Sequence, residues 1–276
     1  MRRFILIIGA FVSALSLSSC IKEGREGCPC YLLFAHEGFR SNGYEGNVNL
    51  FVFEGGQKTK DALYYMEDMV SDRCDVAVNR GHLNVRGIAG IAWMQKTGAS
   101  ELVIPYGHDC DPIYSFSDDM LAQREREPVF AELHKQHACV YMDVNVDVST
   151  NVLIKVTGNT NAVDLKTMTP VEGYFGYVTP RNDEGIFTFR LPRQKDPELY
   201  LEIWCSEDED YRPSDHSMTG CTRITSLNLG AYINGIGYDW TADSLADIYI
   251  NVDFVNSVMT MTVRDWDIYE IFSIDV

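Results

Sequence analysis

The chain has 276 residues, with 23 lysines and arginines against 40 aspartates and glutamates, and a formal net charge of −17 at pH 7. Such an acidic balance argues against binding to nucleic acid and against direct docking on anionic lipid headgroups. With 46% hydrophobic residues, the chain can build the cores of one large domain or two ordinary ones.

The first twenty residues have the pattern of a bacterial lipoprotein signal peptide. Two arginines precede an apolar stretch that runs to Leu15, and Leu17-Ser18-Ser19-Cys20 has the branched, small, small, cysteine order of a lipobox. The stretch is too short and wrongly flanked for a transmembrane helix. We expect residues 1–19 to be removed, Cys20 to carry lipid chains that hold the protein on a membrane, and residues 20–27 to form a tether. The alternative is an ordinary secretory signal with a chance cysteine.

Beyond Cys28 the dominant pattern is alternation of apolar and polar residues in short runs. These runs are residues 48–52, 140–148, 152–156, 187–191, 199–203, 248–254 and 259–263. Alternation of this length predicts half-buried antiparallel strands. Hairpin turns are expected at residues 182–185 and 256–257. Many short strands punctuated by Gly, Asn and Asp predict an all-β chain of β-sandwiches.

Helix signals are few. Ser117-Asp118-Asp119-Met120 predicts the start of a helix, because acids lie at its beginning, basic residues follow, and Pro128 would stop it. Residues 61–70 predict a second short helix. We place a domain boundary near Pro128, which gives an N-terminal domain over residues 28–128 and a C-terminal domain over residues 129–276.

The search for catalytic chemistry finds no nucleophile elbow, phosphate loop, dinucleotide fingerprint or zinc-protease helix. His134, His137 and Cys139 are close in sequence, but strand residues three apart point to opposite faces, which disfavours a metal site. The acidic run at residues 207–210 lacks the spacing of a calcium loop. We therefore predict a protein that is not an enzyme, with no catalytic residue, no cofactor and no metal ligand.

Two sets of residues leave alternatives open. Seven cysteines remain besides Cys20, so at most three disulfides can form, and several cysteines can be buried free thiols. Five aromatic residues could line a sugar-binding face, although in a sandwich such residues more often fill the core. They are Tyr174, Phe175, Tyr177, Tyr238 and Trp240.

The order of several motifs after the lipobox resembles a known family. The motifs are Cys28-Pro29 with the strand at 31–34, the run at 47–53, the segments at 88–93 and 152–159, and the closing Val263-Arg264-Asp265-Trp266-Asp267-Ile268. Together they resemble the FimB-type fimbrial anchor lipoproteins of Bacteroidales, the anchor subunits of type V pili. The resemblance covers essentially the whole chain after Cys20.

This resemblance implies two tandem transthyretin-like antiparallel β-sandwich domains with one or two short helices. It also implies an outer-membrane lipoprotein, displayed on the cell surface through the lipid on Cys20, that anchors a fimbria and limits fibre length. Its partners would be fimbrial shaft subunits that bind by strand exchange. Residues 268–276 are the candidate donor strand, and the alternative is an ordinary last strand.

A second function fits the lipobox and the sandwiches equally well. It is a glycan-binding surface lipoprotein of a polysaccharide-uptake system.

Overall fold

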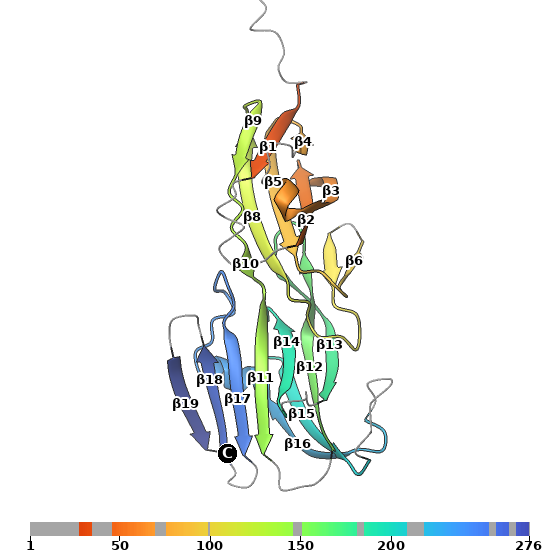
Figure 1. Cartoon of the computed structure of the whole chain (residues 1–276), viewed down its shortest axis with the longest axis vertical. Coiled ribbons are helices and arrows are strands. Elements are labelled where there is room, and N and C mark those ends of the chain that lie inside the picture. The colour runs from red at the N-terminus through yellow and green to blue at the C-terminus, as the bar shows by residue number, and fades with distance from the viewer. Residues whose placement is uncertain are drawn as a thin grey trace, which may run out of the picture.

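The structure is a computed structural model that describes residues 28–34, 46–69, 76–98, 100–145, 151–180, 185–208, 218–253, 258–264 and 269–275. The predicted lipid-bearing Cys20, the signal peptide and the tether lie outside these residues. The described chain forms an elongated molecule built almost wholly from strands (Figure 1). The all-β prediction is confirmed, and the described residues include two short helices.

The N-terminal sandwich has a three-stranded and a five-stranded sheet, which share one core. The first sheet runs in the order β4 (Val76–Val78), β1 (Cys30–Phe34) and β9 (Arg126–Val129). The second runs in the order β10 (His134–Lys135), β8 (Tyr114–Ala122), β5 (Gly81–Ala89), β2 (Asn47–Glu54) and β3 (Gln57–Tyr65). Side chains from both sheets, among them Leu32, Val52 and Val85, meet in a buried cluster, as facing sheets require.

The C-terminal sandwich also packs two sheets around one core. One sheet runs in the order β14 (Phe187–Pro192), β11 (His137–Asn145), β17 (Asp247–Asp253), β18 (Val258–Arg264) and β19 (Tyr269–Asp275). The other contains β16 (Thr222–Asn228), β15 (Leu199–Ser206), β12 (Asn151–Asp164), β7 (Glu101–Val103) and β6 (Gln95–Thr97), with β13 (Pro170–Pro180) also paired to β12. The two layers lie in the lower half of Figure 1.

Period-two alternation explains which side chains enter this second core. Along β11, Val140, Met142 and Val144 are buried while the residues between them face outward. Most strand pairs are antiparallel, but β1 pairs with β9 and β11 pairs with β17 in parallel. The second helix, α4 (Leu229–Gly235), begins where the Asn228 side chain accepts a hydrogen bond from the Ala231 N–H at 2.8 Å.

The helix predicted from Ser117 onward is wrong. Residues 117–122 belong to β8, which pairs with β5 along its whole length, so that Ser117 lies opposite Arg86. The acids that suggested a helix start instead serve the sheet, since Asp119 accepts from Asn84 at 2.8 Å. The second predicted helix is also mostly strand. Residues 61–65 complete β3, and only α3 (Met66–Met69) is helical.

One stretch before the predicted boundary at Pro128 packs with the later part of the chain. β7 pairs with β12, and Leu102, Ile104, Cys110 and Ile113 lie in the same buried cluster as Val140 and Ile154. Strands β6 and β7 therefore complete a sheet of the C-terminal sandwich. The boundary itself stays a prediction.

Candidate functional site: a groove where the two sandwiches meet

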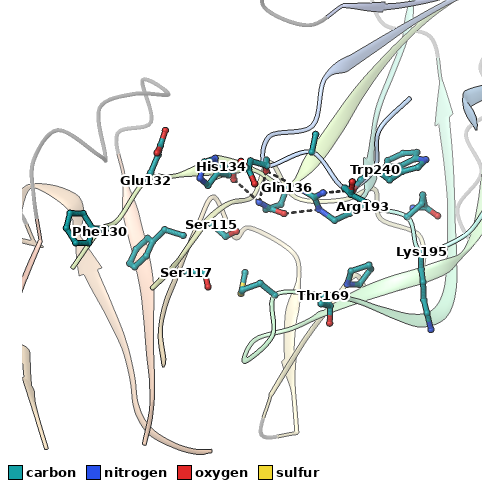
Figure 2. Close-up of a pocket in the computed structure, with 17 residues that line it drawn as sticks. Ser115, Ser117, Phe130, Glu132, His134, Gln136, Thr169, Arg193, Lys195 and Trp240 are labelled. Atoms are coloured by element: carbon teal, nitrogen blue, oxygen red, sulfur yellow. Dashed lines mark hydrogen bonds between the residues drawn. The ribbon is translucent and has the colours of Figure 1, made fainter. Parts of the chain in front are cut away.

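A groove of about 710 Å³ lies where the two sandwiches meet. One wall comes from β8 and the segment that follows β9, with Ser115, Phe130 and Glu132. The opposite wall comes from loops of the C-terminal sandwich that carry Arg193 and Trp240. Figure 2 shows Phe130 and Glu132 on one side of the groove and Trp240, Arg193 and Lys195 on the other. Its volume is in the range of ligand-binding clefts.

The guanidinium of Arg193 connects the loops that line the groove through hydrogen bonds. Its Nε donates to Gln136 Oε1 at 3.1 Å, one Nη donates to the Trp240 carbonyl, and the other donates to the Asp243 carbonyl at 3.2 Å. Gln136 Nε2 in turn donates to the carbonyls of His134 at 3.3 Å and Asp243 at 3.4 Å. Burial lowers the pKa of Arg193, and the negative charges of Asp239 and Asp243 act in the opposite direction. Most of its donors face protein carbonyls, so Arg193 acts here as a structural tie.

A partly buried ion pair joins the two sandwiches close to the groove. Lys135 of β10 contacts Asp247 of β17 through its Nζ. The backbone adds two links, because the Leu245 N–H donates to the Lys135 carbonyl at 2.9 Å and the Lys135 N–H donates to Ser244 Oγ at 3.2 Å. The ion pair and the two backbone hydrogen bonds together hold the two sandwiches against each other at this point.

His134 and His137, two of the residues weighed above for a metal site, lie in different surroundings. His134 lines the groove, whereas His137 is buried with its Nδ1 3.1 Å from the Ile113 carbonyl oxygen. Burial lowers the pKa of His137 to about 4, and the nearby charges of Lys135 and Arg190 act in the same direction. Across the described residues no group of three or more His, Cys, Asp or Glu is arranged to hold a metal ion.

The cysteines of the described residues are free thiols: Cys28, Cys30, Cys110, Cys139, Cys205 and Cys221. Cys110 and Cys139 lie on either side of Arg190, because the Cys110 N–H donates to the Arg190 carbonyl and Cys139 pairs with Arg190 in the sheet. Two strand spacings, roughly 10 Å, then separate their backbones. That is beyond the reach of a disulfide.

The five aromatic residues considered for a sugar-binding face do not form one surface. Phe175 and Tyr238 are buried, and the Tyr238 hydroxyl donates to the Ala246 carbonyl at 2.8 Å. Tyr177 packs partly buried against the C-terminal core, and Trp240 lies tilted against Tyr238 with ring centroids 4.6 Å apart. Only Tyr174 is largely exposed.

The architecture is all-β with two packed sandwiches, and comparison with solved structures bears this fold out. No family model and no curated protein matches the chain. Solved structures do match. One, described as a candidate polysaccharide-binding protein of Bacteroides thetaiotaomicron, has a TM-score of 0.58 at 11% identity and covers 90% of this chain and 98% of its own.

Two further solved structures share the fold. The fimbrial anchor protein Mfa2 of Porphyromonas gingivalis has a TM-score of 0.57 at 12% identity, covering 87% of this chain and 98% of its own. A candidate adhesin of Bacteroides thetaiotaomicron has a TM-score of 0.55 at 11% identity, covering 85% of this chain and 95% of its own. The resemblance to fimbrial anchors indicated by the motif order is thus confirmed as a shared fold.

Proposed function

We propose that this protein is an outer-membrane lipoprotein that anchors a fimbria to the cell surface and limits the length of the fibre. The observation that carries the proposal is the fold shared with the anchor Mfa2 over nearly the full length of both chains. The lipobox at Cys20 supplies the means of attachment. The role is binding rather than catalysis. None of the helices in the described part of the chain is long and apolar enough to cross a bilayer.

The placement of the elements supports an anchoring role. Strand β1 begins at Cys30, ten residues after Cys20, and it lies near one end of the elongated molecule (Figure 1). Strands β17, β18 and β19 lie in the opposite half. A tether of residues 20–27 spans at most roughly 30 Å when extended. Such a tether keeps the N-terminal sandwich near the membrane and presents the C-terminal sandwich to a fibre.

The proposed contact with fimbrial subunits uses the edge strand β19. The predicted donor segment at residues 268–276 coincides with this strand, which pairs with β18 at the end of its sheet. An edge strand offers a row of backbone N–H and C=O groups to an added strand. We propose that a fimbrial subunit pairs with this edge, so that β19 need not leave β18.

The test uses the Cys20→Ala variant with Cys28→Ala as the matched control, expressed in the native host. The variant is expected to leave the outer-membrane fraction and to shed fimbriae into the medium, whereas the control stays membrane-bound. A Cys20→Ala protein that remains in the outer membrane contradicts lipid anchoring.

A second measurement tests the partner. The native lipoprotein is extracted from outer membranes in detergent, and the proteins that come with it are identified by mass spectrometry. Fimbrial subunits are the expected partners. Outer-membrane transporters and glycan-binding proteins in their place would favour the polysaccharide-uptake function.

A further inference from the structure

Four aromatic side chains, together called the aromatic row, form two stacked pairs on the surface beside β13. The rings of Trp93 and His108 stack with centroids 5.3 Å apart and an interplanar angle of 27°. Those of Tyr106 and Tyr174 stack at 6.0 Å and 24°. Tyr106 and His108 belong to one turn, so the two stacks are neighbours. Trp93, Tyr106 and Tyr174 are exposed by 59%, 60% and 56%.

Buried polar contacts hold the tryptophan end of the row in place. The fully buried carboxylate of Asp111 accepts hydrogen bonds from the backbone N–H groups of Ala92 at 2.7 Å, Trp93 at 2.8 Å and Met94 at 2.8 Å. Charge-assisted hydrogen bonds of this kind are short and strong. They fix the backbone of the loop from which the Trp93 side chain projects.

The tyrosine end is fixed by a turn and a glycine. Gly107 adopts a φ of 84°, which only glycine reaches without strain, and its N–H donates to the Gly176 carbonyl at 3.0 Å. The Tyr174 ring lies over Gly176, where an added Cβ would sit 2.9 Å from its Cε1 atom. Rings already fixed in this way lose little conformational freedom when a ligand binds.

We propose that this aromatic row, made of Trp93, His108, Tyr106 and Tyr174, is a binding platform for a neutral glycan chain. The faces of aromatic rings are electronegative, and the polarised C–H groups on one face of a sugar ring pack against them. Two neighbouring stacked pairs offer more than one ring to the successive sugars of an oligosaccharide. The net charge of −17 disfavours acidic glycans.

The size and the borders of the row favour a glycan over a protein partner. Three rings of roughly 200 Å² each, exposed by somewhat more than half, offer on the order of 350 Å². A standard protein interface uses about 800 Å² per partner. The exposed residues Gln95, Lys96 and Glu172, which are close in sequence to Trp93 and Tyr174, are polar.

Hydrogen-bonding groups continue from the row onto the outer face of the sheet. Burial, together with Tyr106 and Glu202, raises the pKa of the Tyr174 hydroxyl. Glu202 accepts from Trp204 Nε1 at 3.2 Å and pairs with Arg223 at 3.0 Å. Planar polar groups beside an aromatic platform suit the hydroxyls around the edge of a sugar ring.

The test measures binding of the full lipidated chain in detergent to defined neutral probes: cellohexaose, laminarihexaose, maltohexaose and yeast mannan. Intrinsic tryptophan fluorescence and calorimetry report binding. The variants Trp93→Ala and Tyr174→Ala are each expected to weaken the Kd at least tenfold. Tyr65→Ala is the matched control, because Tyr65 is an equally exposed ring, at 66%, on β3. It is expected to stay within twofold of the parent chain.

Circular dichroism checks that each variant is folded, and Tyr106→Ala replaces Tyr174→Ala if the latter is not. A parent chain that binds none of the four probes at millimolar concentration overturns the proposal. So does binding that survives both ring removals. Loss of fimbrial subunit capture in Trp93→Ala, without glycan binding by the parent chain, would assign the row to a protein interface instead. Fimbrial anchoring is scored separately on cells, so failure here leaves the anchor function standing.

Discussion

Asp111 is a single side chain on which the conformation of a whole loop depends. In Asp111→Ala, three backbone N–H groups around Ala92, Trp93 and Met94 lose their acceptor in buried surroundings. We expect the free energy of unfolding to fall by about 3 kcal/mol, since unsatisfied buried groups cost roughly 1–3 kcal/mol each and are partly relieved by water. Urea denaturation measures the loss.

Glu172→Ala is the control, because it breaks only the exposed pair with Lys195 at 3.2 Å. This variant should lower the free energy of unfolding by under about 1 kcal/mol. Equal losses in the two variants would show that the acceptor role of Asp111 is unimportant.

His137 makes stability depend on pH. Its pKa in the folded state is about 4, below the ordinary histidine value of 6.5, because the ring is buried and lies near Lys135 and Arg190. Between these values the unfolded chain binds a proton that the folded chain does not. The free energy of unfolding therefore falls as the pH drops from about 6.5 to 4, by up to about 3 kcal/mol.

Denaturation of His137→Gln at several pH values tests this dependence. The glutamine amide can still donate to the Ile113 carbonyl, and the variant is expected to flatten the pH dependence within that window. His82→Gln, at an exposed position of β5, should leave the dependence as it is. An unchanged slope in His137→Gln would place the proton uptake elsewhere.

At the scale of elements, alternation was the reliable signal and charge placement was not. The run at residues 140–148 correctly predicted β11 as far as Asn145, because Val140 and Val144 face a continuous core, and residues 146–148 lie outside the described residues. Residues 117–122 misled because acids at the start of a run suit a helix N-terminus in isolation. In the folded chain, β5 lies beside them and supplies a full ladder of strand partners. No local pattern announces which strand will lie alongside, so tertiary pairing decided this element.

The open edge of β19 is tested with a pair of proline variants. Neighbouring residues of a strand direct their N–H groups to opposite edges, so of Phe272→Pro and Ser273→Pro, one removes a bond to β18 and the other blocks the open edge. We expect one variant to lower the melting temperature. The other should fold normally and lose capture of fimbrial subunits in a pull-down. If both folded variants capture subunits as well as the parent chain, the edge of β19 is not the contact.

At the scale of the whole molecule, the sequence indicated two sandwiches but could not show that their construction is interleaved. Strands β6 and β7 are three residues each, too short for alternation to be recognised. The pairing of β7 with β12 spans some sixty residues of sequence, as Val103 lies opposite Ala162, and β6 pairs in turn with β7. The groove also depends on contacts between residues distant in sequence, because Ser115, Arg193 and Trp240 come together only where the two sandwiches meet.

The sequence did not indicate the aromatic row for a similar reason. Trp93 and His108 are brought together by the buried carboxylate of Asp111, which lies 18 residues after Trp93.

This interleaving predicts that the C-terminal half does not fold alone when the chain is divided after Pro128. A fragment of residues 129–276 lacks the buried side chains of Met94, Leu102, Ile104, Cys110 and Ile113. Losing a large buried side chain costs about 2–5 kcal/mol, and a domain has only about 5–15 kcal/mol in total. The fragment should therefore show no cooperative thermal transition by circular dichroism, whereas the chain from residue 28 to 276, which keeps every member of this cluster, should show one. A fragment of residues 129–276 that melts within a few degrees of the intact chain would mean that its core is complete without the earlier segment.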